Sequence, residues 1–448
     1  MTVDQTKQTL PRQLGLASAT AVVVSNMIGT GIFTSAGFMA GDLGDGKLVI
    51  AVWLVGALFA LAGALCYSEL AINFPKSGGE YVYLTEAYGP TWGFMSGWVS
   101  FFAGFSAPVA AAALAFSHYL SVFIPALKKN ILFFDGEQIV ACALIALFTI
   151  VNCFGIARAA RLQNFLTAIK VIVLLAFVAL GFAFGHGDWS HFTTLASRTS
   201  HTSIPVQFII SLVWVMVGYS GWNAATYIAE EIKDPQRTLP RALAIGTLLV
   251  AVLYLGMNML FIYSTPLEEM KGVLAIGSLS AKNLFGPSAA AGFGALMAVS
   301  IMSTVSAMVM IGPRVVYAMA KDGAFFRRAG TLHPKWKTPV FAVLAQGVCS
   351  MLMTFTKFPE LMFYIGLSLT FFTVAAVSSI FVFRKRPDWK ILPAMNFGFP
   401  TILIAYIFIG VCMMVYGIIW QPFPSLMAAA TICAGALVYR SRFSGKQN

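Results

Sequence analysis

The chain has 448 residues, of which 58% are hydrophobic and only 10% are charged. Soluble domains carry about 25% charged residues, so this composition excludes a water-soluble protein and indicates a polytopic protein embedded in lipid. The formal net charge of +12 is dispersed over predicted loops, which excludes nucleic acid as a partner and points to a loop bias of membrane proteins.

Hydrophobic segments long enough to span a bilayer follow one another along the chain. A spanning helix needs about 20 mostly apolar residues. Residues 1–13 form a polar tail without the cleavage pattern of a signal peptide, and the chain is predicted to be one transmembrane domain, 1–448. The predicted helices cover residues 14–40, 48–73, 90–123, 138–156, 161–184, 204–231, 240–264, 287–320, 338–356, 360–383, 398–417 and 419–440.

Basic residues are distributed unequally between the two predicted sides. An even number of spans places both termini together, and 21 of the 29 Lys and Arg residues fall on that side, against 7 on the other. The positive-inside rule therefore predicts a multi-pass cell-membrane protein with both termini in the cytoplasm.

Cysteine and histidine give no sign of a metal site or cofactor. The six cysteines all lie inside apolar segments and are interpreted as small buried hydrophobes. The long external loop 185–203 carries His186, His191 and His201, which we expect to be solvated and not to bind metal.

Glycine interrupts two of the hydrophobic segments at corresponding positions. The first is broken at Met27-Ile28-Gly29-Thr30-Gly31 and the sixth at Gly218-Tyr219-Ser220-Gly221. Matching breaks five segments apart are typical of transporters built from two inverted halves. The predicted architecture is an all-α membrane protein with a 5+5 inverted repeat, helices 1–5 over about 14–184 and helices 6–10 over about 204–383. Helices 11 and 12, over about 398–440, lie outside the repeat.

The breaks are suited to a small zwitterion. A half-helix that starts near Gly31 has free N–H groups and a positive dipole end, which favour a carboxylate, and glycine at 29 and 31 allows close approach. The carbonyls of Trp214 to Val217, ahead of Gly218, are predicted to accept from an ammonium group. Close packing of small residues is the alternative interpretation of these glycines.

Selectivity is expected from side chains around the second break. Tyr219, Trp222 and Asn223 follow it directly, and Trp214 lies one turn before it, where it can cap the site; ordinary helix packing is the alternative for each aromatic residue. No Asp or Glu is predicted at mid-membrane depth, since Glu69 lies toward the cytoplasmic end of helix 2. A neutral substrate is therefore favoured over a cationic amino acid or polyamine.

Lys170 is placed well inside helix 5, where a lysine costs about 2.5–3.5 kcal/mol on insertion scales. It can remain charged and bond the free carbonyls of helix 1, or load and release a proton during transport. Snorkelling to the interface is the structural alternative. Ser303, Thr304 and Ser306 of helix 8 either line the same space or only satisfy helix carbonyls.

Four stretches resemble the amino-acid/polyamine/organocation permeases, and within them the L-type amino acid transporters and their bacterial relatives. One alone would be weak evidence, but all four occur in order over helices 1–9. They are Asn26 to Phe33; Pro75-Lys76-Ser77-Gly78-Gly79-Glu80-Tyr81; Tyr219 to Asn223 with Glu230 to Pro235 and Leu239 to Ala242; and Arg314 to Gly323.

The resemblance implies that Ile28, Gly29, Thr30 and Gly31 hold the substrate carboxylate and that the backbone near Val217 and Gly218 holds its amine. It places Asn223 beside the site. Lys170 matches a lysine that stands where sodium-coupled relatives bind an ion, which implies sodium independence.

Two positions depart from the family pattern. Val217 replaces a frequent aromatic gate, so Trp214 is the expected lid. The segment 123–138 has no cysteine, so no covalent ancillary subunit is expected.

The predicted function is secondary transport of neutral L-amino acids by alternating access, either as an exchanger or as a proton symporter. Ser303 and Thr304 join Lys170 as coupling candidates. A transporter of cationic amino acids or polyamines with the same fold is the nearest alternative. An amino-acid sensor would need a longer signalling tail, a channel would need a charged ring or filter, and an enzyme would need clustered catalytic residues, none of which is predicted.

Overall fold

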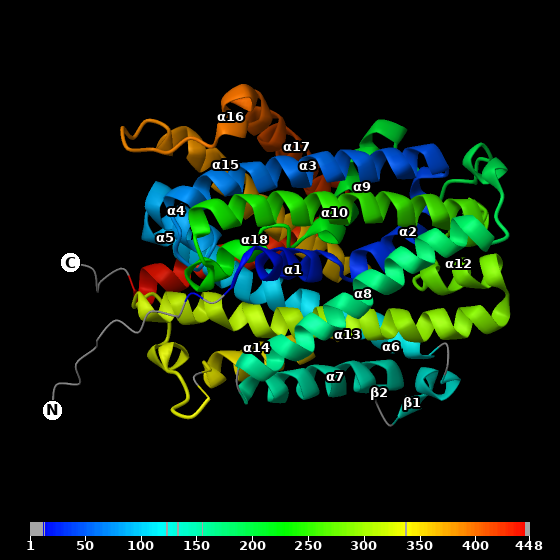
Figure 1. Cartoon of the computed structure of the whole chain (residues 1–448), viewed down its shortest axis with the longest axis horizontal. Coiled ribbons are helices and arrows are strands. Elements are labelled where there is room, and N and C mark those ends of the chain that lie inside the picture. The colour runs from blue at the N-terminus through cyan, green and yellow to red at the C-terminus, as the bar shows by residue number, and fades with distance from the viewer. Residues whose placement is uncertain are drawn as a thin grey trace.

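The computed structural model describes residue 12 and residues 14–121, 124–131, 134–154, 156–336 and 338–443. Long helices run side by side along one direction, with connecting segments at both ends (Figure 1). Among the described residues, 11 helices or joined helix pairs are long and apolar enough to cross a membrane. The predicted ninth span is the shorter apolar helix α14, Val340–Met353.

The first half of the chain contains two short strands besides its helices. Its elements are α1 (Leu16–Met27), α2 (Thr30–Leu43), α3 (Gly46–Asn73), α4 (Glu80–Tyr88), α5 (Pro90–Val99), η1 (Ser100–Ser106), α6 (Ala107–Ser121), η2 (Pro125–Lys128), β1 (Asn130–Ile131), β2 (Phe134–Asp135), α7 (Gly136–Cys153), α8 (Ile156–Phe184) and η3 (Trp189–Phe192).

The second half is helical in all its described elements. They are α9 (Ile204–Tyr219), η4 (Ala224–Glu231), α10 (Pro235–Ser264), α11 (Leu267–Met270), α12 (Ile276–Phe285), α13 (Pro287–Lys321), η5 (Arg327–Gly330), α14, α15 (Phe358–Phe383), α16 (Pro393–Gly398), α17 (Thr401–Trp420) and α18 (Pro422–Arg442).

Both spans that carry the glycine motifs are interrupted. In the first, α1 ends at Met27 and α2 begins at Thr30, with Gly29 extended at φ −125° and ψ −157° between them. In the second, α9 continues through Gly218 to Tyr219, and the chain turns at Gly221, whose φ of 97° lies in the region that favours glycine. The second interruption therefore lies later than the glycine pattern predicts.

Two groups of long helices pack closely within the bundle. In one group α3 lies along α10, and α1 also packs on α10. In the other group α13 packs along α6, and α7 packs on both α6 and α14. Helix α8, which carries Lys170, packs on α13 and reaches α1, so it joins the groups beside the first interruption.

The third span contains a feature that hydropathy does not reveal. Residues Ser100–Ser106 form a π-helix, η1, between α5 and α6. Such segments are frequent at functional sites because they redirect the side chains of a helix. The hairpin of β1 and β2 and the short helices α4, α12 and α16 were likewise not predicted. The predicted tail 1–13 lies outside the described residues apart from residue 12.

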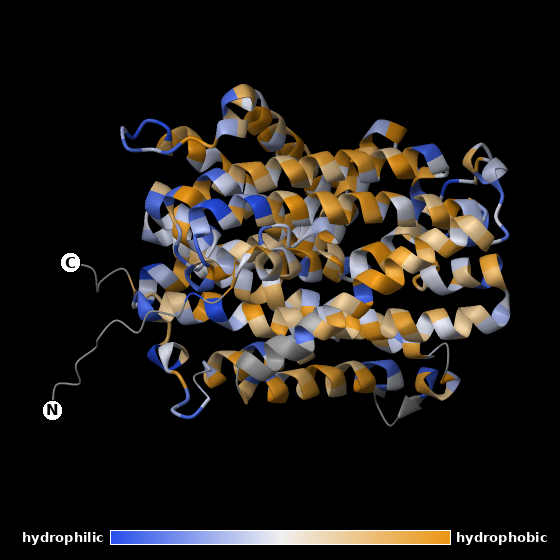
Figure 2. Cartoon of the chain, viewed as in Figure 1, coloured by the Kyte–Doolittle hydropathy of each residue, from blue (hydrophilic) through white to orange (hydrophobic). Residues whose placement is uncertain are grey.

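Apolar residues dominate the middle of the long helices, whereas hydrophilic residues gather at their two ends (Figure 2). Large side chains such as Leu58, Ile172 and Phe408 are more than half exposed on the outside of the bundle, as expected of surface that faces lipid tails. The cysteines are free, and Cys66 and Cys153 are buried. The prediction of burial is wrong for Cys433, which is exposed because α18 lies at the edge of the bundle.

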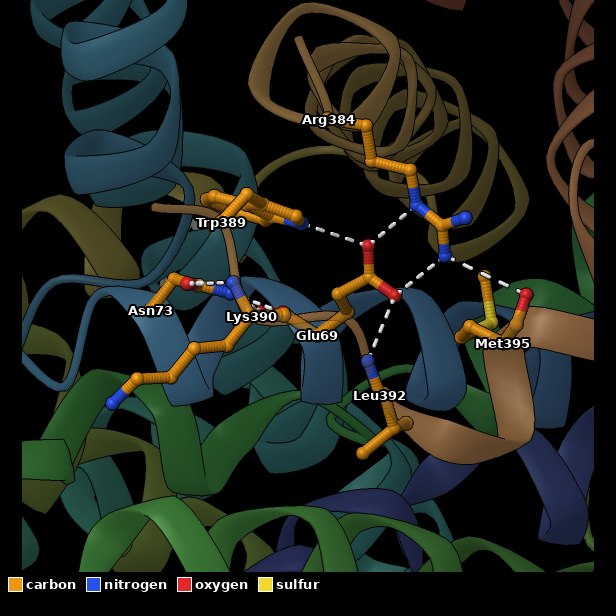
Figure 3. A network of polar contacts seen from close by, with 7 residues as sticks. All are labelled: Glu69, Asn73, Arg384, Trp389, Lys390, Leu392 and Met395. Carbon is orange, nitrogen blue, oxygen red and sulfur yellow. Dashed lines mark hydrogen bonds and ion pairs between the residues drawn. The ribbon is translucent and has the colours of Figure 1, made fainter. Parts of the chain in front are cut away.

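A buried ion pair joins helix α3 to the segment after α15 (Figure 3). Both oxygens of Glu69 accept from Arg384, at 2.8 and 2.7 Å. Trp389 Nε1 and the Leu392 N–H also donate to this carboxylate, at 2.9 and 3.3 Å. Glu69 is fully buried and its charge is completely matched, so the cluster fastens two distant parts of the chain.

Candidate functional site

The interruption of the first span lies directly against Lys170. Its Nζ donates to the Ile28 carbonyl at 2.6 Å and to Thr304 Oγ1 at 2.9 Å, with the Ser25 carbonyl at 3.4 Å. The side chain has no exposed surface, so it does not snorkel. Lys170 therefore satisfies carbonyls left free by the broken helix.

The Met27 carbonyl and the Thr304 hydroxyl also form hydrogen bonds at the first interruption. Tyr254 OH donates to the Met27 carbonyl at 2.6 Å, and Thr304 Oγ1 is 2.9 Å from the Ile28 carbonyl. Ser303 is buried but accepts from Gln163 Nε2 at 3.2 Å instead of contacting Lys170. Of the two predicted coupling candidates on helix 8, Thr304 reaches the lysine and Ser303 belongs to a separate pair.

The two interrupted spans touch each other through glycine. A Cβ built on Gly31 would lie 2.3 Å from the Cα of Gly218, and one built on Gly221 would lie 2.8 Å from the carbonyl carbon of Asn26. No side chain larger than hydrogen fits at either position without moving backbone. These glycines therefore do allow close packing of the two spans, which was the alternative interpretation. They also lie at or next to the interruptions.

One of the predicted ammonium acceptors on the sixth span, the Val217 carbonyl, is already occupied. Because α9 extends to Tyr219, the carbonyls of Trp214 to Val217 do not end a helix at Gly218 as predicted. The Val217 carbonyl accepts from the Ser220 N–H at 3.1 Å and from Ser220 Oγ at 2.8 Å. The serine thus caps the helix end itself.

A cavity of about 60 Å³ lies beside the second interruption. One water molecule needs about 10–15 Å³ of such space, so the cavity can hold a few waters or part of a small solute. Its wall includes Val217, Ser220, Trp222 and Asn223, which were all predicted as site residues.

Other predicted residues lie near the cavity without lining it. Ile28, Gly29, Thr30 and Gly31 form the first interruption, with the uncapped N-terminus of α2 behind them. Gly218 packs on Gly31, and the Tyr219 ring packs on Trp53 and Tyr254, away from the cavity.

Glu80 is a cavity residue that the sequence analysis did not identify as one. Tyr67 OH and Asn223 Nδ2 donate to its Oε1 at 2.8 and 2.6 Å, and Tyr227 OH donates to Oε2 at 2.6 Å. Burial raises the pKa of the Glu80 carboxyl, and hydrogen bonds from these side chains oppose that shift. The sequence predicted no Asp or Glu at mid-membrane depth, and Glu80 lies outside the apolar spans although it belongs to the cavity wall.

The position of Glu80 follows from a glycine turn that a hydropathy pattern does not reveal. The residue begins α4, directly after Gly78 and Gly79, which both have positive φ. A Cβ on Gly79 would lie 2.6 Å from the ring of Tyr227, so the turn brings the start of α4 onto η4. The stretch 75–81 was the available signal, because it was already one of the motifs behind the family resemblance.

Trp214 is buried in an aromatic cluster on the other side of the interruption. Its ring stacks on Phe38 of α2, with centroids 4.9 Å apart, and meets Phe363 of α15 edge to face at 5.2 Å. It does not line the cavity.

The histidines of the loop 185–203 show no metal geometry. The rings of His186 and His191 face the backbone carbonyls of Leu284 and of Ile262 and Tyr263, and His191 is half-buried. Within the described part of the chain, no group of three or more His, Cys, Asp or Glu side chains is placed to hold a metal ion.

Comparison with known proteins gives one family and several relatives. The family profile described as amino acid permease matches residues 14–432. The large neutral amino acids transporter small subunit 2 of Oryctolagus cuniculus is 28% identical over 437 residues, which cover 96% of this chain and 80% of that protein. The serine/threonine exchanger SteT of Bacillus subtilis is 28% identical over 386 residues, 84% of each chain. The b(0,+)-type amino acid transporter 1 of Mus musculus is 28% identical over 348 residues, 77% of this chain and 70% of that protein.

Proposed function

The chain belongs to the amino acid permease family, and we propose that it exchanges neutral L-amino acids across the cell membrane, without sodium, by alternating access. The observation that carries the proposal is the pair of interrupted spans, which meet at Gly31 and Gly218 near a cavity. Helix interruptions of this kind are tolerated inside a membrane only where they line a cavity or are buried in protein.

Sodium independence is supported by Lys170. Its ammonium group contacts the Ile28 carbonyl and Thr304 Oγ1, which are oxygen ligands of the kind that a bound cation would use. A lysine that already supplies a positive charge at these oxygens leaves a sodium ion no role there. The proposal includes no chemical conversion of the amino acid.

Neutral substrates are supported by the relatives' names and by the state of Glu80. The carboxylate in the cavity wall already accepts from Tyr67, Asn223 and Tyr227. A cationic side chain would have to displace or compete with these donors. We therefore keep transport of cationic amino acids as the second candidate, because Glu80 is the buried carboxylate that such a substrate would need.

Exchange is proposed over proton symport because one relative is named as an exchanger. We also propose that both termini are cytoplasmic, in agreement with the distribution of basic residues. The names of several relatives designate a small subunit, so an associated subunit is compatible with the proposal. The sequence of 123–138 contains no cysteine, and we propose that any such association is not covalent.

Purified protein in proteoliposomes tests the proposal. Vesicles loaded with unlabelled neutral amino acids are expected to accumulate the labelled amino acid from outside, equally with sodium and with potassium and with no pH gradient. Uptake that collapses with a protonophore and needs no internal amino acid would replace exchange by symport. Absence of uptake for every neutral amino acid, with uptake of lysine or arginine, would overturn the neutral specificity.

A further inference from the structure

The side chain of Asn223 is held in one orientation by its neighbours. Its Nδ2 donates to Glu80 Oε1 at 2.6 Å and lies 3.2 Å from the hydroxyl of Tyr227. An ionised carboxylate can only accept hydrogen bonds, so it must face the NH₂ group of the amide and not its oxygen. The Tyr227 hydroxyl supports the same orientation, because its hydrogen goes to Glu80 Oε2 and its oxygen can then only accept from the amide.

The consequence is a free acceptor in the cavity wall. Asn223 lines the cavity and its NH₂ group is engaged, whereas its Oδ1 makes no hydrogen bond with any described residue. Two main-chain acceptors at the interruptions are already occupied. The Ile28 carbonyl accepts from Lys170 and Thr304, and the Val217 carbonyl accepts twice from Ser220.

The same wall carries other hydroxyl-bearing residues. Thr370 and Thr373 of α15 and Tyr406 of α17 line the cavity together with Asn223. The cavity lining also includes apolar side chains, namely Phe105, Met216 and Met308. The cavity is thus lined by both polar and apolar side chains, and Asn223 Oδ1 is one of the acceptors among them.

We propose that Glu80 is a positioning residue for substrate specificity: it turns Asn223 so that Oδ1 accepts a hydrogen bond from the side-chain hydroxyl of the transported amino acid. The inference rests on the proposed function and names its substrate class, small neutral amino acids with a side-chain hydroxyl. A site that offers an unpaired acceptor discriminates against an apolar side chain of the same shape, because the acceptor is then buried without a partner.

Threonine and valine are the matched pair of probes, since they differ only in one hydroxyl and one methyl group. With the full-length protein in proteoliposomes loaded with unlabelled amino acids, we expect the wild type to prefer threonine over valine by about tenfold in kcat/KM. Asn223→Leu is expected to bring this ratio close to one.

Glu80→Gln is expected to lower the ratio at least twofold, because glutamine offers the Asn223 amide a donor as well as an acceptor and so permits both orientations. The double variant Glu80→Gln/Asn223→Asp is expected to restore the preference. The introduced glutamine amide can then donate to one oxygen of the new carboxylate while the second oxygen accepts from threonine. Glu86→Gln, an exposed carboxylate on the same helix α4, is the control and leaves the ratio unchanged.

The other possible results show whether the role of Glu80 and Asn223 or the proposed transport function has failed. A wild-type ratio near one, in a protein that does carry amino acids, overturns the inference and leaves the proposed function standing. A wild-type ratio that Glu80→Gln does not change, in a folded variant, removes the positioning role. If Glu80→Gln does not fold, the double variant decides by its ratio. If the wild type carries no amino acid at all, the proposed function itself has failed.

Discussion

The molecule buries two kinds of charge, and they lie in different regions. At one end of the bundle Glu69 is matched by the guanidinium of Arg384 through two hydrogen bonds. At the interruptions, Lys170 is held by carbonyl and hydroxyl oxygens, and Glu80 by two phenols and an amide. Neither Lys170 nor Glu80 forms an ion pair within the described chain.

The difference separates charges that secure the fold from charges that serve the site. A buried charge that is paired with an opposite charge is neutralised locally, and the ion pair stabilises the contact between the two segments. A buried charge that is held only by neutral groups costs more to bury, and such residues in a membrane interior are functional candidates by default. Lys170 and Glu80 both lie where the helices are interrupted, which is where alternating access would require rearrangement.

The largest effect is expected from breaking the pair. Arg384→Met leaves the Glu69 carboxylate buried with no cation, and removal of one partner of a buried pair costs about 3–5 kcal/mol. We expect the free energy of unfolding in detergent to fall by about this amount. The double variant Glu69→Leu/Arg384→Met should recover most of the loss, because no charge remains buried. A single variant as stable as the wild type would contradict the role of the pair.

The next effect concerns Lys170 and is expected in transport. Lys170→Met keeps much of the side-chain volume and removes the donor to Ile28 and Thr304. Hydrogen bonds to charged groups contribute about 1.5–3 kcal/mol, so we expect exchange to slow by about tenfold or more. Labelled amino acid counterflow in proteoliposomes measures this, with the exposed Lys282→Met as the control. Unchanged counterflow in Lys170→Met would show that the Lys170 side chain is not needed for transport.

A smaller effect is expected from a pair that is closer to solvent. Glu231, at the end of η4, contacts Arg314 of α13 at 3.2 Å, and the side chains are 16% and 14% exposed. Partly exposed pairs contribute about 1 kcal/mol or less, so Glu231→Gln should lower the free energy of unfolding by about that amount. Its exposed neighbour Glu230→Gln should leave stability unchanged. If Glu231→Gln lowered the free energy of unfolding as much as Arg384→Met, this pair would be as important for stability as the buried pair.

The smallest effect is expected at Ser303, which contacts Gln163 and not Lys170. Ser303→Ala removes one neutral hydrogen bond, worth about 1 kcal/mol, and we expect exchange to change by less than about twofold. Thr304→Val, one residue along, removes a contact to both Lys170 and the Ile28 carbonyl and should slow exchange more. Equal counterflow rates in the two variants would mean that contact with Lys170 does not matter.

The sequence by itself determined the class of fold. Spans of about 20 apolar residues can be counted because lipid leaves the backbone no partner outside its own helix. The break at Ile28 to Gly31 could be placed for the same reason, since glycine within an apolar segment marks a local loss of helix. Lys170 could be singled out because a lysine inside such a segment is costly unless something bonds it.

Only the tertiary structure decided which polar groups meet. Glu80 lies outside every apolar span, so hydropathy gives no hint that α4 folds back and buries it against Asn223 and Tyr227. Gly218 looks like the break of the sixth span but lies within α9, because its lack of a side chain serves the contact with Gly31. Periodicity and composition act along one segment, whereas hydrogen-bond partners and close contacts are set by segments far apart in the chain.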